Sequence, residues 1–191
     1  MAEHSLMTIA DVLQSHLERR PVPQLPTLAR LSIVAKAQAL VAACGVRMET
    51  GGIQPCFDPS TDIIYCPHPA FYWLMLIWKR PKRYAIDVCH ELIHASGQRE
   101  RLHRPRHEHW GDVIYQREEL VAELGSALLM HDLGIKSRPR LPHAKYLKSW
   151  LQGLDNPTVE LDLAMARANI AAGWVIAVAR KNAARRQRSY A

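Results

Sequence analysis

The sequence has only four cysteines, and no two of them stand in a C-x-x-C spacing. That spacing is typical of cysteine-rich zinc modules and of redox motifs, so neither class is expected. The amino end also lacks the charged and then apolar pattern of a secretory signal. Together these absences predict reduced cysteines and a cytoplasmic protein.

Linkers and long hydrophobic runs are lacking as well. The apolar segment at residues 170–179 is about half as long as a bilayer-spanning helix, which predicts a buried helix and no membrane contact. No Gly- or Ser-rich linker and no internal repeat interrupts the 191 residues, 48% of which are hydrophobic. We expect an N-terminal helix and Pro-rich connector over residues 1–27, one folded domain over residues 28–180 and a basic tail over residues 181–191.

Turn and helix signals along the chain predict the order of the main elements. Gly45 stands where a helix would end, and an Asn-Pro pair at residues 156–157 is typical of a helix start. We expect a helix over about residues 28–43, strands over about residues 46–50 and 55–66, and a long final helix from Pro157.

An H-E-x-x-H pattern is formed by His90, Glu91 and His94. Residues four apart on a helix lie on nearly the same face, so the two imidazoles can reach one metal ion, while Glu91 lies about 100° further round than His90. Residues 84–89 contain no Gly or Pro, and Gly97 stands where the helix would end. The pattern predicts two histidine ligands for Zn²⁺ and a glutamate that acts as general base.

A catalytic zinc site needs a third protein ligand and one open position for water. Residues 115–129 have the apolar spacing of a helix, on which Glu119 and Glu123 share a stripe beside the apolar face. Glu118 points about 100° away from that stripe. We assign Glu119 as the third ligand and Glu123 as an outer partner that orients a ligand histidine, the main alternative being Glu123 as the ligand.

These segments resemble a known family. The sequences H-E-L-I-H-A-S-G at residues 90–97 and R-E-E-L-V-A-E-L-G at residues 117–125 are similar to the zincin-like metallopeptidase domain of ArdC-type antirestriction proteins. The resemblance covers about residues 30–175. It implies a mostly helical α+β fold with a small sheet beside the H-E-x-x-H helix, a gluzincin-type zinc site and an origin on a bacterial mobile element. The usual N-terminal single-stranded DNA-binding domain of that family has no counterpart in the sequence.

Two further candidate catalytic residues follow Pro142. A helix that begins there would place His143 and Tyr146 on one face. Zincins often use a His or Tyr from a later helix to hydrogen-bond the oxyanion, and ordinary amphipathic packing is the alternative reading. Three histidines between residues 103 and 109 do not predict a second metal site, because Pro105 interrupts their spacing.

The chain carries a formal net charge of +7. Its basic residues are spread over segment 79–83, the loop around Arg104 and the tail, which is compatible with weak DNA association through a basic surface. We also expect the loop arginines to hold the acidic helix in place. An edge strand of the small sheet is expected to hold a peptide in extended form.

The sequence as a whole favours a zinc-dependent metallopeptidase that acts on a protein or peptide. Two alternatives differ from it in class. The first is a zinc-stabilised, DNA-associated antirestriction module without proteolysis. The second is a regulatory protease for a single partner protein.

Overall fold

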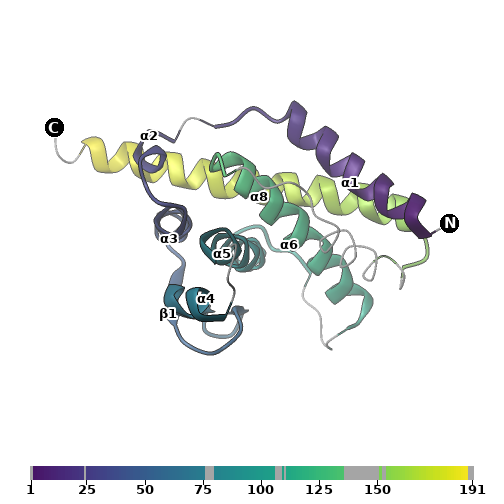
Figure 1. Ribbon diagram of the computed structural model, residues 1–191, viewed down its shortest axis with the longest axis horizontal. Helices are drawn as coiled ribbons and strands as arrows, with labels where there is room; N and C mark the ends of the chain where they lie inside the picture. The colour runs from purple at the N-terminus through teal and green to yellow at the C-terminus, as the bar shows by residue number, and fades with distance from the viewer. Residues whose placement is uncertain are drawn as a thin grey trace.

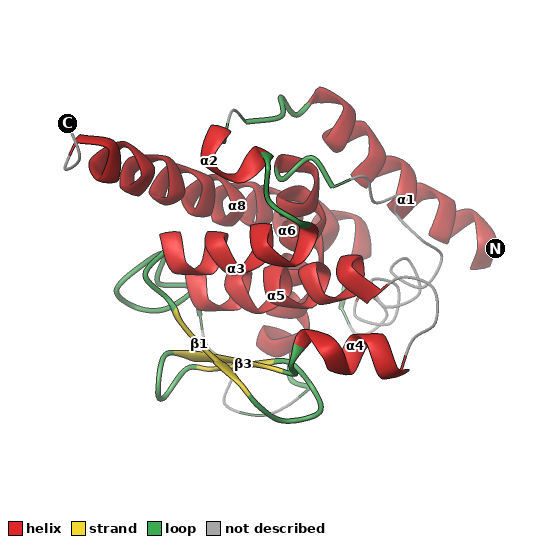
Figure 2. Cartoon of the chain, turned by 60° about the vertical axis from the view of Figure 1, so that its left-hand side comes forward, coloured by secondary structure: helices red, strands yellow, loops and turns green. Residues whose placement is uncertain are grey.

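The computed structural model describes residues 2–23, 25–75, 80–105, 109, 111–135, 151 and 154–188. The fold is mostly helical with one small sheet, which confirms the α+β class (Figure 2). In chain order the elements are α1 (Ala2–Arg19), α2 (Pro26–Ala29), α3 (Ile33–Ala43), β1 (Arg47–Thr50), β2 (Cys56–Asp58), β3 (Ile63–Cys66), α4 (Pro69–Met75), α5 (Arg80–Ser96), α6 (Val113–Asp132) and α8 (Pro157–Arg188).

The helix expected over about residues 28–43 is in fact two helices, α2 and α3. Ser32 caps the second helix, because its Oγ accepts a hydrogen bond from the backbone N–H of Ala35 at 3.2 Å. Gly45 adopts a φ of +70° after α3, as expected for a residue that ends a helix. The cap at Ser32 therefore starts a new helix at a point where the apolar periodicity alone predicted one continuous helix.

The small sheet has the strand order β1-β3-β2. Strands β1 and β3 are parallel, with Arg47 opposite Ile63, whereas β2 and β3 are antiparallel, with Cys56 opposite Tyr65. The stretch expected as one strand over residues 55–66, with a turn signal at residues 58–60, is thus a hairpin that turns after Asp58. Its turn is held by Asp58, whose carboxylate accepts hydrogen bonds from residues 60 and 61. The sheet lies against α5, as expected, and β2 forms one edge (Figure 2).

Helix α8 extends along most of the molecule and packs against α6 (Figure 1). Its segment Pro157–Arg185 is long and apolar enough to cross a membrane by length and composition. Its buried residues nevertheless recur at helical spacing on one face, as in the core helix of a globular domain: Leu161, Ala164, Met165, Ala168, Ala171, Ala172, Val175, Ile176 and Ala179. The helix continues without a break through residue 180, and Leu13 and Leu17 of α1 join the same core. The domain boundaries placed at residues 27 and 180 stay predictions.

Helices α5 and α6 approach each other closely at Gly125. A Cβ atom added there would lie 2.8 Å from both Cδ1 and Cγ1 of Ile93, so only glycine fits without a shift of the neighbouring helix. One residue further, the Ser126 hydroxyl donates to the backbone carbonyl of Ile86 at 2.9 Å. Because Gly125 has no side chain, α6, which carries the glutamates, can lie this close to α5, which carries the H-E-x-x-H pattern.

We predict opposite effects of the same substitution at two helical glycines. Gly125→Ala should lower the free energy of unfolding by about 1–3 kcal/mol, because the added methyl group overlaps Ile93. Gly173→Ala in α8 should raise it by about 0.5–1 kcal/mol, because a Cβ there meets nothing within 4 Å. Denaturant unfolding of both variants measures this. Equal changes in the free energy of unfolding of the two variants would contradict the close approach of α5 and α6 at Gly125.

Candidate metal centre

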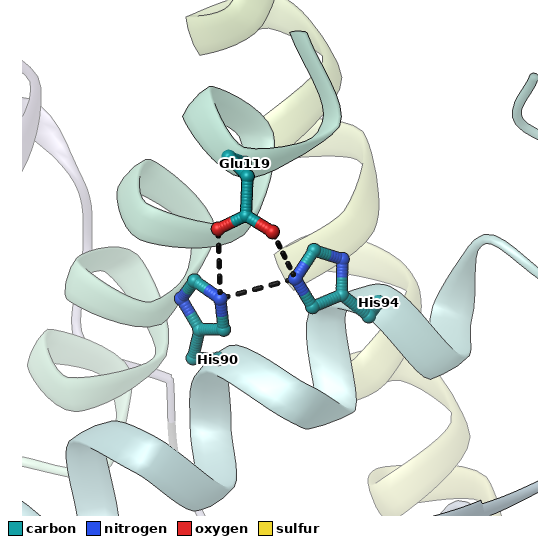
Figure 3. Close-up of side chains that lie close together, drawn as sticks. All are labelled: His90, His94 and Glu119. Carbon is teal, nitrogen blue, oxygen red and sulfur yellow. Dashed lines mark hydrogen bonds and ion pairs between the residues drawn. The ribbon is translucent and has the colours of Figure 1, made fainter. Parts of the chain in front are cut away.

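Helices α5 and α6 bring the side chains of His90, His94 and Glu119 together (Figure 3). The Nε2 atoms of the two histidines are 3.0 Å apart. The Glu119 carboxylate faces both rings, with Oε2 lying 3.5 Å from Nε2 of His90 and Oε1 lying 3.5 Å from Nε2 of His94. Three potential ligand atoms from two helices therefore surround one point.

The spacing of these atoms fits a tetrahedral ion. Zinc-to-ligand distances of about 2.1 Å at tetrahedral angles place ligand atoms about 3.4 Å apart. The two Nε2 atoms are 3.0 Å apart, and each lies 3.5 Å from one of the two Glu119 oxygens, so the separations lie close to that value. Two imidazole nitrogens and one carboxylate also form the donor set of catalytic zinc sites, which keep a further position open. The residues present therefore fit Zn²⁺.

The electrostatics of the cluster favour a bound cation. Burial lowers the pKa of His94, but hydrogen bonds to Glu118 and Glu119 outweigh this and raise the pKa to about 10. Burial raises the pKa of Glu119, yet its hydrogen bonds to the two histidines bring that pKa well below its ordinary value. The carboxylates thus stabilise positive charge at the point where the imidazole nitrogens meet.

Each histidine also has a carboxylate at its other ring nitrogen. Nδ1 of His90 lies 3.7 Å from Oε1 of Glu123, and Nδ1 of His94 lies 3.3 Å from Oε1 of Glu118. Outer carboxylates of this kind fix the tautomer and orientation of ligand histidines. Glu123 therefore lies where an outer partner is expected, and its role stays a prediction.

Glu118 is the residue that the sequence analysis missed. Its position on α6 places it about 100° from Glu119, which suggested that it points away from the site. In the structure α6 lies against α5 so that Glu118 reaches Nδ1 of His94, the ring nitrogen that faces away from Glu119. A signal was present, because two ligand histidines need two outer partners and the helix offers a third glutamate.

Arginines support both outer carboxylates. Arg104 donates two hydrogen bonds to Glu118, from Nε to Oε2 at 2.9 Å and from Nη2 to Oε1 at 2.7 Å. Arg83 bonds to Asp87 at 2.8 Å and stabilises Glu123 by charge. As expected, a loop arginine holds the acidic helix in place.

The three potential ligands lie in an open cleft of about 580 Å³. Glu91 lines the same cleft and is itself only 7% exposed. The edge strand β2 contributes Cys56 and Phe57 to the opposite wall. Tyr115, one helical turn before Glu119, is a lining residue that the sequence analysis did not single out. The cleft is thus large enough for several peptide atoms beside a metal ion.

Two candidate catalytic residues are not among those that the structure describes. His143 and Tyr146 fall outside the described residues, so their catalytic role stays a prediction. Within the described ranges, His90, His94 and Glu119 are the single group of His, Cys, Asp or Glu side chains spaced to hold a metal ion. All four cysteines are free, as expected.

A family model described as a zincin-like metallopeptidase matches residues 35–167, which span the sheet, both metal-binding helices and the first part of α8. The chain belongs to this family. It is also similar to the solved structure of the antirestriction protein ArdC from plasmid R388 in its Mn(II)-bound form, with a TM-score of 0.59 and 26% identity over 84% of this chain and 54% of that one. The metal-free ArdC structure gives a TM-score of 0.57. Zn²⁺ is the metal that fits the family and the donor set.

Two curated proteins are similar in sequence. The chain is 31% identical to the uncharacterised y4eC protein of Sinorhizobium fredii over 153 residues, which make up 80% of this chain and 48% of y4eC. It is 33% identical to the DNA primase TraC of Escherichia coli over 151 residues, 78% of this chain and 14% of TraC. The chain thus spans about half or less of these relatives.

We predict different losses of zinc affinity at the two glutamates that share a stripe. Glu119→Ala should remove a metal ligand and therefore weaken zinc binding more than Glu123→Ala does. Glu123→Ala should weaken it by about 10- to 100-fold, which is typical of an outer partner. Competition with a chromophoric chelator measures both. A larger loss for Glu123→Ala would make Glu123 the third ligand.

Proposed function

We propose that the protein is a zinc-dependent peptidase. The observation that carries this proposal is the placement of Glu91 in the wall of an open cleft beside His90, His94 and Glu119. A purely structural zinc site is closed by four protein ligands, whereas the described part of the chain offers three in a cleft. Membership of the zincin-like metallopeptidase family supports the same conclusion.

The chain's own residues have distinct tasks in the proposed reaction. His90, His94 and Glu119 hold the metal ion. When bound, Zn²⁺ acts as a Lewis acid that allows water to lose a proton near neutral pH and polarises a peptide carbonyl. Glu91 accepts the proton of the attacking water on its carboxylate and later donates it to the leaving amine.

The substrate we propose is a protein segment in extended form. Among the described residues, strand β2 is an edge of the sheet, and it lines the cleft beside the potential metal ligands, so we propose that a peptide backbone pairs with its outer edge. The lining also includes Pro55, Phe57 and Tyr115, which offer apolar contacts to substrate side chains. Whether the enzyme acts generally or on one partner protein is tested with a panel of denatured proteins and of proteins encoded beside its gene.

We predict that Glu91→Gln retains zinc but loses peptidase activity by about 10²- to 10⁴-fold, because the substituted amide cannot accept the proton. His94→Ala should lose both zinc and activity. Metal analysis and hydrolysis of a denatured protein substrate measure the two properties separately. Undiminished hydrolysis by zinc-loaded Glu91→Gln would rule out the proposed role of Glu91.

A second candidate function is DNA association without proteolysis, as in an antirestriction module. It is favoured by the end of α8, where exposed Arg180, Lys181, Arg185 and Arg188 follow a stretch with no acidic residue after Asp162. The similarity to ArdC and to a DNA primase is compatible with it. Lys and Arg bind phosphates through release of counterions, independent of base sequence.

For this candidate we predict salt-dependent binding to single-stranded DNA that Glu91→Gln leaves unchanged. Replacing the four basic residues with Gln should reduce the slope of log affinity against log salt by about 3, because each phosphate contact contributes roughly 0.7. Fluorescence anisotropy over a salt series measures the slope. No binding at low salt, or an unchanged slope, would exclude this surface.

A further inference from the structure

Arg104 lies in the loop after α5 and is nearly buried, with 9% of its side chain exposed. Besides its two bonds to Glu118, its guanidinium donates to the backbone carbonyl of Ile93 at 2.6 Å and to the hydroxyl of Ser96 at 3.0 Å. One side chain therefore binds the last turns of α5 and the first turns of α6 at the same time.

The loop is shaped to place this guanidinium against the end of α5. A Cβ atom at Gly97 would lie 2.9 Å from Nη2 and 3.0 Å from Cζ of Arg104, so a side chain there would displace the guanidinium from this position. The backbone N–H of Arg104 also donates to the carbonyl of Gly97 at 3.0 Å. Arg104 is thus fixed by its backbone as well as by its side chain.

These contacts continue directly to the metal centre. Both carboxylate oxygens of Glu118 accept hydrogen bonds from the Arg104 guanidinium. Oε1 of the same carboxylate lies 3.3 Å from Nδ1 of His94. Two parallel hydrogen bonds from the planar guanidinium of an arginine fix the rotation of a carboxylate. The single ammonium group of a lysine, on its flexible side chain, does not. The carbonyl that Arg104 binds belongs to Ile93, the residue next to His94. Arg104 therefore contacts both the carboxylate beside the His94 ring and the peptide group that precedes His94.

We propose that Arg104 is a positioning residue of the metal centre. It orients Glu118 so that this carboxylate keeps the His94 ring turned with Nε2 toward the ion. This proposal deepens the proposed function, since the centre it supports is the one assigned to peptide hydrolysis. It concerns metal affinity, however, and can be tested whether or not any substrate is cleaved.

The same loop offers a matched control. Arg101 also donates two bonds to a carboxylate, that of Asp62, at 2.7 Å each, and one bond to a carbonyl of α5, that of Ala95. Its side chain is 13% exposed, close to the value for Arg104. Asp62 lies in the turn between β2 and β3 and contacts neither ligand histidine. Like Arg104, Arg101 therefore binds a carbonyl next to His94, but its carboxylate partner has no recorded contact with the His94 ring, so the control isolates the bond through Glu118.

The experiment compares zinc affinity and thermal stability in full-length Arg104→Gln, Arg104→Lys and Arg101→Gln. We expect Arg104→Gln to weaken zinc binding by about 10- to 100-fold, and Arg104→Lys to recover little, because a lysine cannot bridge both carboxylate oxygens. Arg101→Gln should lower the thermal midpoint to a similar degree while its zinc affinity stays within about threefold of the unmodified protein.

A second variant, Glu118→Gln, covers the case in which Arg104→Gln does not fold. It should weaken zinc binding to the same degree, and adding Arg104→Lys to it should cause little further loss, as expected for residues that act in series. Equal zinc affinities in Arg104→Lys, Glu118→Gln and the unmodified protein would overturn the proposal. An equal loss in Arg101→Gln would also overturn it, since the effect would then be structural. If the zinc affinities differ as expected but the unmodified protein hydrolyses no substrate, the result would count against the proposed peptidase function and not against the role of Arg104.

Discussion

The site depends on the close approach of α5 and α6. Gly125 leaves no side chain between the helices, and Ile93 fills the space. At this distance short glutamate side chains reach both nitrogens of the histidine rings, as the separations of 3.3–3.7 Å at Nδ1 and 3.5 Å at Nε2 show. The metal centre is therefore a property of the interface between the two helices.

Charge is balanced in layers around that interface. Two imidazoles and Glu119 form the inner layer, Glu118 and Glu123 lie outside it, and Arg104 and Arg83 stabilise those carboxylates from further out. Each carboxylate of these layers has an opposite charge or an imidazole nearby, which offsets the cost of its burial. A divalent ion adds positive charge where three carboxylates converge. The arrangement thus favours metal binding before any substrate is considered.

Helical periodicity was enough to predict that His90, His94 and Glu119 lie together, because it depends only on positions along single helices; their role as ligands stays a prediction. It failed for Glu118, since a sequence gives the angle of a residue about its own axis but not the angle at which another helix crosses it. The break between α2 and α3 was missed for a different reason. Ser32 caps a new helix inside an apolar stretch, and the spacing of apolar residues does not predict where a side-chain cap forms.

The loop after α5 is also joined to the opposite wall of the cleft. Gln98 donates to the carbonyl of Pro59 at 2.8 Å, and Arg101 binds Asp62, so the β2–β3 turn is fastened to the end of the metal-binding helix. These bonds fix the distance between β2 and the potential metal ligands when the chain folds. For the peptidase proposed above, substrate selection would then rest on whether a polypeptide fits a cleft of set width.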